Sequence, residues 1–219
     1  MRPQYLDWLI QEKPVTTCEG KQIVIYEIVI QNDESVLNSW AKHLREHYCA
    51  DSEMDLLREG YRFKRDEYLA KIKFPDANIN PGPSVRSGDF TEILIADYVQ
   101  YVLDYIVPRT RYDRKVNRNS STMGSDLIGY KCGKKISSSD ELIVFEVKAT
   151  ASETRPSSKA RLQKAVDDSN KDVVRLAESL NAVVQRLIDR GDLDEARQDR
   201  KSTRQNSSHI RRSRMPSSA

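Results

Sequence analysis

The sequence predicts an α/β protein with a mixed sheet, whose C-terminal part runs helix, strand, strand, strand, helix. Three observations predict this order. The apolar run at residues 93–106 is long enough for a buried helix. Three short runs rich in β-branched and aromatic residues follow it, separated by Gly-, Ser- and Asn-rich loops, and these predict strands. Apolar residues at helical spacing from Ser157 to about Asp189 then predict a long helix.

Residues 1–86 are expected to form a separate α/β region that contacts a partner. The β-branched run from Gln22 to Ile30 predicts a strand, and apolar residues from Val36 to Cys49 recur at helical spacing. A second helix is expected from about Met54 to Ile72. The segment from Phe74 to Val85 holds three prolines and predicts a loop at the regional boundary.

Residues 87–198 contain the helix and strand core. Asp89 and Glu92 fit a capping box, so the first core helix is expected to begin beside them. The strands are expected at about 110–116, 126–132 and 141–150. Because only a short loop separates the last two, they should pair as an antiparallel hairpin. That pairing would bring Asp126 close to Glu146.

Two charged residues follow the apolar run of the last predicted strand. A buried strand is not expected to continue into charged residues without a reason, because burying a charge is costly. Glu146 and Lys148 come directly after the run from Leu142 to Phe145. Side chains alternate between the faces of a strand, so both charges should point the same way. The carboxylates of Asp126 and Glu146, with the main-chain carbonyl of Val147, are oxygen ligands of the kind that Mg²⁺ takes.

This set of groups suits the hydrolysis of a phosphodiester. A metal ion polarises the phosphate and generates hydroxide from bound water. Lys148 would point at the attacking water or at the charge that develops on the phosphorane, where a positioned cation stabilises the transition state. We therefore expect a site that uses Mg²⁺ or Mn²⁺, with Glu92, Asp126, Glu146 and Lys148 as its catalytic residues.

The same residues resemble the PD-(D/E)XK nuclease superfamily. Asp126 matches the first acidic position, Glu146 the second, Lys148 the lysine, and Glu92 the helix acid of many members. Ser125 stands where the name-giving proline would be. The resemblance implies a restriction-endonuclease-like core with the order α-β-β-β-α-β.

A closer resemblance is to HamA, the family of nuclease subunits of the Hachiman anti-phage defence system. The motifs that carry it are GDFTE at 88–92, GSD at 124–126, FEVK at 145–148 and RLQKAVDDS at 161–169. The resemblance implies a DNA nuclease restrained by a superfamily 2 helicase until infection. Gln163 and Lys164 match a position where many superfamily members place polar residues near the scissile phosphate. The alternative is that both are ordinary helix-surface residues.

Basic residues gather around the strand expected at 110–116. They are candidate contacts to DNA phosphates, because the backbone rather than the bases should dominate recognition in a chain without a finger or recognition-helix motif. An ordinary solvated edge strand is the alternative. The residues are Arg109, Arg111, Arg114, Lys115 and Arg118.

Two other functions remain open from the sequence. His43-Leu-Arg-Glu46-His47 reads H-x-x-E-H, the inverted zinc-protease motif, which would make Glu46 a general base. No later segment marks the third zinc ligand, and a solvated helix face explains the string as well. The third possibility is a non-catalytic nuclease-fold module that binds DNA or the helicase.

The bulk composition indicates a cytoplasmic protein with no membrane partner. Apolar runs are too short for a membrane span, and the N-terminus lacks a signal-peptide core. The three cysteines are widely separated, so neither a disulfide framework nor a thiolate zinc site is indicated.

The formal charge of +3 depends on the C-terminal segment. Residues 1–198 hold 30 basic and 32 acidic groups. The run from Asp199 to His209 resembles translated sequencing-adapter DNA almost residue by residue, so residues 199–219 are interpreted as adapter read-through, with a disordered tail as the alternative. Without them, the last strand of the superfamily has no counterpart after Asp189, so we expect a truncated nuclease core whose activity the sequence leaves open.

Overall fold

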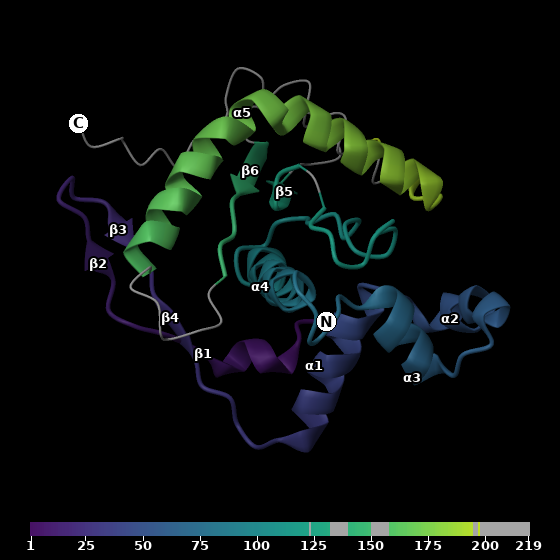
Figure 1. Cartoon of the computed structure of the whole chain (residues 1–219). Coiled ribbons are helices and arrows are strands. Elements are labelled where there is room, and N and C mark those ends of the chain that lie inside the picture. The colour runs from purple at the N-terminus through teal and green to yellow at the C-terminus, as the bar shows by residue number, and fades with distance from the viewer. Residues whose placement is uncertain (123, 132–139, 150–157, 195–196, 198–219) are drawn as a thin grey trace. The chain divides into compact units, whose positions relative to one another are not determined.

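The computed structural model describes residues 1–122, 124–131, 140–149, 158–194 and 197 (Figure 1). Two compact units make up the chain, Met1–Glu46 and His47–Ala219. The boundary predicted near residue 86 falls inside the second unit, and the predicted tail lies outside the described residues. In the described part of the chain, no helix is both long and apolar enough to cross a membrane.

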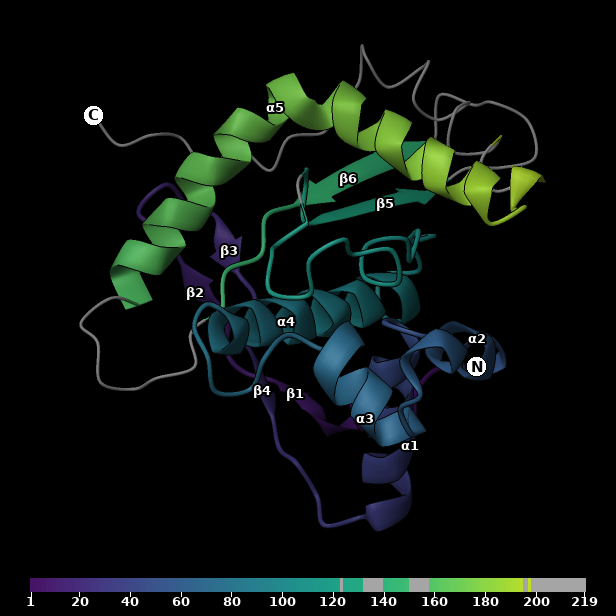
Figure 2. The same cartoon turned by 45° about the vertical axis from the view of Figure 1, so that its right-hand side comes forward.

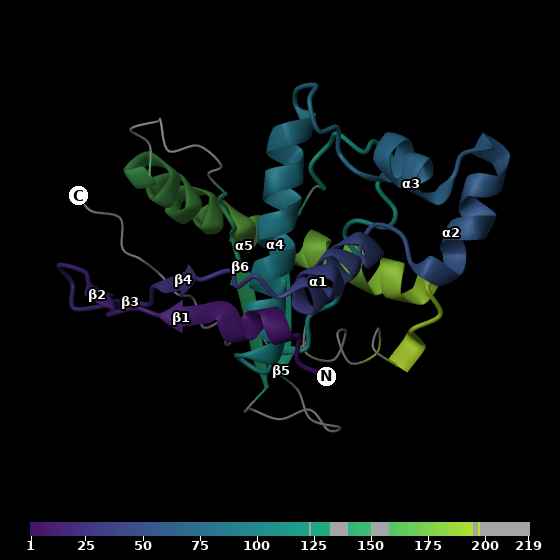
Figure 3. The ribbon, with the colours of Figure 1, turned by 90° about the horizontal axis from the view of Figure 1, so that it is seen from below.

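The first unit contains short strands and one α-helix. Its elements are η1 (Gln4–Trp8), β1 (Leu9–Gln11), β2 (Val15–Thr16), β3 (Gln22–Ile23), β4 (Tyr26–Ile28) and α1 (Glu34–Glu46). β1 pairs antiparallel with β4, and β2 with β3 (Figure 3). The strand predicted over residues 22–30 is interrupted, because its two halves pair with different strands. Val24 and Ile25, at the interruption, are exposed.

Helix α1 confirms the helix predicted from Val36, although it begins two residues earlier. Asp33 precedes it, and its Oδ1 accepts the main-chain N–H groups of Ser35 at 3.0 Å and Val36 at 3.2 Å. These bonds satisfy donors that have no partner inside the first turn. Trp40, on the buried side of α1, stacks on Tyr5 with 4.6 Å between ring centroids.

The second unit begins with short helices in place of the single helix predicted over residues 54–72. They are α2 (Asp51–Arg58), η2 (Glu59–Tyr61), α3 (Arg65–Tyr68) and η3 (Leu69–Lys73). Gly60 lies at the break, and Arg62 follows with a φ of 57°. A residue in the left-handed region cannot continue a right-handed helix, so the prediction of one helix was wrong.

Helix α4 (Gly82–Tyr101) begins well before the predicted capping box. Pro83 lies in its first turn, where a missing N–H costs nothing. Asp89 is therefore inside the helix and buried, where its Oδ2 accepts the Tyr48 hydroxyl at 2.8 Å and pairs with Lys115. The capping-box interpretation is wrong, and Glu92 is not needed to cap this helix.

The strand predicted at 110–116 is also wrong, because this segment forms turns and bends. Arg111 and Lys115 turn toward carboxylates of α4 instead of extending beside a strand. A strand-like contact occurs earlier, where Ile106 and Tyr130 exchange main-chain hydrogen bonds of 2.8 and 2.9 Å. Among the described residues every strand pair is antiparallel, whereas a mixed sheet was expected.

Strands β5 (Leu127–Lys131) and β6 (Glu141–Phe145) confirm the predicted antiparallel hairpin. Their register pairs Leu127 with Phe145 and Lys131 with Glu141. Figure 2 shows the two strands side by side between α4 and α5 (Ser158–Asp189). β6 ends at Phe145, so Glu146 and Lys148 lie just beyond the strand that was expected to contain them.

Helix α5 confirms the long helix predicted at the end of the core. Leu176, Leu180, Val183 and Leu187 are buried, in the apolar pattern that predicted the helix. They form one hydrophobic cluster with side chains of β5 and β6, including Tyr130 and Leu142. The packing fixes one side of α5 against the hairpin.

Candidate active site

The ends of the hairpin bring Asp126 and the segment Glu146 to Lys148 together. Asp126 directly precedes β5 and Glu146 directly follows β6, so the pairing of Leu127 with Phe145 places them at the next position along the ladder. The main-chain N–H of Val147 donates to Asp126 Oδ2 at 2.8 Å. This hydrogen bond joins the two predicted metal-binding segments.

Lys148 lies between two carboxylates. Its Nζ contacts Glu146 Oε1 and lies 3.2 Å from Asp168 Oδ2, on α5. Burial by itself would lower the pKa of Lys148, but the bonds to Glu146 and Asp168 outweigh burial and raise that pKa above its ordinary value. Lys148 is therefore an ammonium at neutral pH.

Glu92 reaches Asp126 through the guanidinium of Arg111. Arg111 Nε lies 3.3 Å from Glu92 Oε2, and Arg111 Nη2 lies 3.6 Å from Asp126 Oδ1. The Tyr112 hydroxyl also donates to Glu92 Oε2 at 2.7 Å. Burial raises the pKa of Glu92 to about 7, although Arg111 and Tyr112 act in the opposite direction. The acid of α4 is thus held by an arginine and a tyrosine.

The loop before β5 is held from two sides. Arg111 donates to the main-chain carbonyls of Ser125 and Thr122, the latter at 3.1 Å. From α5, Ser179 Oγ accepts the main-chain N–H of Ser125 at 3.1 Å. Gly124 has a φ of 101°, and a Cβ there would meet Ser179 Oγ at 3.0 Å. Glycine therefore permits both the turn and the close approach of α5.

The oxygen donors of this site fit a magnesium ion. Asp126 and Glu146 supply carboxylates, and the Val147 carbonyl belongs to the residue between Glu146 and Lys148. Mg²⁺ commonly uses only one or two protein carboxylates and completes its shell with water and substrate phosphate. Arg111 and Lys148 contribute the positive charge that balances these carboxylates in the structure.

The predicted substrate-positioning residues precede Asp168 on α5. Gln163 and Lys164 are exposed on α5, and the Gln163 amide donates to Asp167 Oδ1 at 2.9 Å. Their role in positioning a substrate stays a prediction.

The predicted phosphate-binding residues form ion pairs with carboxylates of the chain. Their contact with DNA stays a prediction. Arg109 Nη2 donates to Asp97 Oδ1 at 2.7 Å, and Lys115 pairs with Asp89. Only Arg114 is exposed, with a long pair to Glu53. The pairs are Arg109–Asp97, Arg111–Glu92, Arg111–Asp126, Arg114–Glu53, Arg114–Asp113, Lys115–Asp89 and Arg118–Asp76.

Tyr112 and Ser179 belong to the cluster but lie outside the motifs that the sequence offers, whereas Asp168 lies within the RLQKAVDDS motif and had no role assigned to it. Asp168 and Ser179 are 11 residues apart on α5, a spacing that returns to the same side of a helix after three turns. Two polar residues at that spacing, beside the apolar stripe of the helix, are the sequence signal that could have identified Asp168 and Ser179. Tyr112 has no comparable signal, because its contact depends on how residues 107–116 fold against α4.

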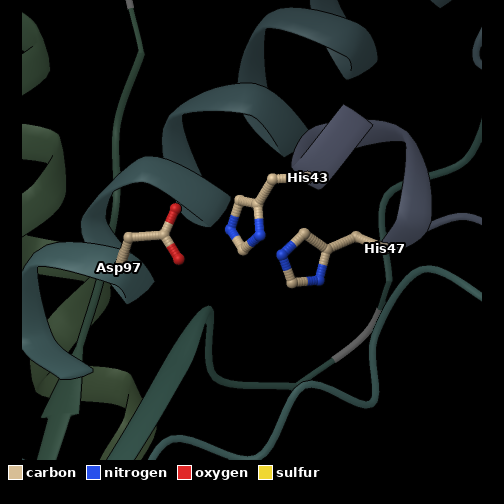
Figure 4. A group of neighbouring side chains, drawn as sticks. All are labelled: His43, His47 and Asp97. Atoms are coloured by element: carbon tan, nitrogen blue, oxygen red, sulfur yellow. The ribbon is translucent and has the colours of Figure 1, made fainter. Parts of the chain in front are cut away.

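The histidine motif H-x-x-E-H is divided between the two units at residues 46 and 47. In the second unit, one ligand atom of His47 lies within 4.8 Å of one of Asp97 (Figure 4). Asp97 is fully buried, and its carboxylate accepts a hydrogen bond from Arg109. The structure thus brings one histidine of the motif close to a buried carboxylate, and zinc binding by this motif stays a prediction. His43, the third labelled side chain, belongs to the first unit.

A family model described as HamA matches residues 3–212 of the chain. This match confirms the resemblance to HamA, whereas the resemblance to the PD-(D/E)XK superfamily stays a prediction. No curated protein and no solved structure matches the chain significantly.

We predict that Asp168→Asn lowers the pKa of Lys148, because it removes one of the two anions beside the ammonium. The titration of the Lys148 side chain, followed by NMR, measures this change. Asp167→Asn is the matched control, since the neighbouring Asp167 is exposed and bonds to Gln163. An unchanged Lys148 titration in Asp168→Asn would show that Asp168 does not hold this lysine.

We also predict a pH-dependent gain of stability for Glu92→Gln. The folded-state pKa of Glu92, about 7, is above the unfolded value, so ionisation of Glu92 opposes folding and its cost appears as pH rises from about 4.5 to about 7. The variant lacks this cost. Its free energy of unfolding should rise relative to wild type by on the order of 2 kcal/mol across that window.

Urea unfolding between pH 4.5 and 8 measures this difference. Glu178→Gln, at an exposed position of α5, is the control for the loss of one glutamate. A difference between Glu92→Gln and wild type that is the same at every pH contradicts the prediction.

Proposed function

The chain belongs to the HamA family, and on that premise we propose that it is a metal-dependent DNA endonuclease of the PD-(D/E)XK type. Family membership indicates an anti-phage defence protein. The proposal adds the chemistry, phosphodiester hydrolysis with Mg²⁺ or Mn²⁺, and a superfamily 2 helicase subunit as the partner that restrains it.

One observation carries the nuclease proposal. The Val147 N–H bond to Asp126 Oδ2 joins the strand ends that bear Asp126, Glu146 and Lys148. Side chains separated by 20 residues of sequence thus meet at one end of a hairpin. Two carboxylates beside an ammonium are the groups that a metal-assisted attack on a phosphate requires.

Each residue has a distinct role in this proposal. Asp126 and Glu146 hold the metal ion, together with the Val147 carbonyl. The metal, when bound, activates water and polarises the scissile phosphate. Lys148 is held as a cation by Glu146 and Asp168, and it stabilises the negative charge that develops on the phosphate oxygens.

Glu92 supports this centre indirectly. Its contacts are to Arg111 and Tyr112, and Arg111 in turn lies beside Asp126. The Arg111 guanidinium therefore links Glu92 to Asp126. We therefore assign Glu92 to the support of Arg111 and Asp126.

We predict that Glu146→Gln and Lys148→Ala each reduce cleavage of plasmid DNA in Mg²⁺ or Mn²⁺ by roughly 100-fold or more, because each removes a charge that acts on the transition state. Agarose gels over a time course measure the rate. Glu141→Gln, at the start of the same strand β6, is the control and should cleave like wild type.

Cleavage at the wild-type rate by both variants would exclude the proposed site. Binding of DNA without cleavage by the wild-type chain, in every divalent metal tested, would instead support a non-catalytic DNA-binding module.

A further inference from the structure

A small cavity lies beside Asp126. Its volume is about 50 Å³, and side chains of α4, residues 107–112, the loop before β5 and α5 line it. A cavity needs roughly 10–15 Å³ to hold one water molecule. The space therefore has room for a few waters or one phosphate group.

One face of α5 forms a wall of this cavity. Ser179, Ala182, Val183 and Arg186 all line it. Their spacing of three, four and seven residues places them on the same side of the helix. Arg186 is also 18 residues, or five turns, after Asp168, which contacts Lys148. The face of α5 that reaches the catalytic lysine thus also presents Arg186.

Arg186 forms no ion pair among the described residues. The neighbouring arginines are paired: Arg111 with Glu92 and Asp126, and Arg190 with Asp113. Burial, Arg111 and Arg190 lower the pKa of Arg186, and Asp113 offsets only part of their effect. A partly buried guanidinium without an anion is costly, so a negatively charged ligand would stabilise it.

One residue that lines the same cavity has a buried hydroxyl. Thr110 is 1% exposed, and its Oγ1 has no hydrogen-bond partner within the described part of the chain. A buried hydroxyl in that state loses the free energy of its hydrogen bond with water. Thr110 can donate its proton to a phosphate oxygen, and an arginine fork can bind other oxygens of the same group.

We propose that this cavity is a phosphate-binding subsite, in which Arg186 and Thr110 bind one phosphate group of the DNA backbone beside the catalytic Asp126. The identity of the ligand as DNA rests on the proposed function. The subsite places the sugar-phosphate backbone against α5, while Asp126 and Glu146 act on the scissile phosphate. Arg186 is a substrate-binding residue in this arrangement and takes no part in the chemical step.

Arg186→Gln tests the subsite in the full chain. The probe is a short fluorescent DNA duplex in Ca²⁺, with binding measured by fluorescence anisotropy at several salt concentrations. We expect about a tenfold weaker affinity and a salt slope that is smaller by about 1, as for the loss of one phosphate contact. Arg62→Gln removes the same charge at an exposed turn and should stay within about twofold of wild type.

Thr110→Val provides a second variant of nearly the same shape. It should weaken DNA binding by about three- to tenfold, because it removes one hydrogen bond from an otherwise unchanged cavity. Circular dichroism and the thermal midpoint establish whether each variant is folded. If Arg186→Gln fails to fold, Thr110→Val still decides the question.

Inorganic phosphate separates the two sources of a phosphate ligand. At millimolar concentration it should raise the thermal midpoint of wild type and leave that of Arg186→Gln unchanged. If both folded variants bind DNA with wild-type affinity, the proposal is overturned. This holds even if inorganic phosphate no longer raises their thermal midpoints, because the ligand of the cavity would then be free phosphate. No effect of phosphate on wild type, with no DNA binding, also overturns it.

Failure of the subsite proposal can be distinguished from failure of the nuclease proposal. Wild type that binds DNA through Arg186 without cutting it retains the subsite and loses the nuclease function. Wild type that cuts DNA while Arg186→Gln binds it equally well retains the nuclease function and loses the subsite.

Discussion

The arrangement of the site depends on the hydrogen bond from the Val147 N–H to Asp126 Oδ2. It extends the β5–β6 hairpin by one contact beyond Leu127 and Phe145, at the point where charged side chains replace apolar ones. Because the bond orients the Asp126 carboxylate against the main chain, Asp126 and Glu146 share one end of the hairpin. Every role proposed for Lys148, Arg111 and Asp168 assumes that convergence.

Charge balance is the second constraint on this region. Carboxylates buried near one another repel, and burial by itself already favours their protonated forms. Two cations offset this repulsion by pairing with the carboxylates. Arg111 comes from the segment after α4, and Lys148 comes from the segment after β6. Asp168 and Ser179 then tie α5 to the same cluster. The site therefore requires α4, the hairpin and α5 to pack together, and Arg186 is the cation left without such a partner among the described residues.

Local patterns were sufficient to predict the hairpin, α1, α5 and the meeting of Asp126 with Glu146, because strand alternation and helical spacing report directly on burial. They were insufficient where distant residues decide the conformation. The segment 110–116 has the composition of a strand, yet Arg111 and Lys115 are drawn to carboxylates of α4. Asp89 resembles a helix cap, yet it lies within α4 and binds Tyr48. Arg186 acquires its place only when α5 docks, which no local motif encodes, and the RLQKAVDDS motif contains Asp168 without indicating its contact with Lys148.

The central claim is that Asp126 and Glu146 jointly hold one divalent metal ion. Calorimetric titration of the purified chain with Mn²⁺ tests it most directly, using wild type, Asp126→Asn and Glu146→Gln. The account predicts one ion per wild-type chain and a loss of at least tenfold in affinity for each variant, since each removes a charged ligand while the fold is kept. Wild-type Mn²⁺ affinity in either folded variant would contradict it.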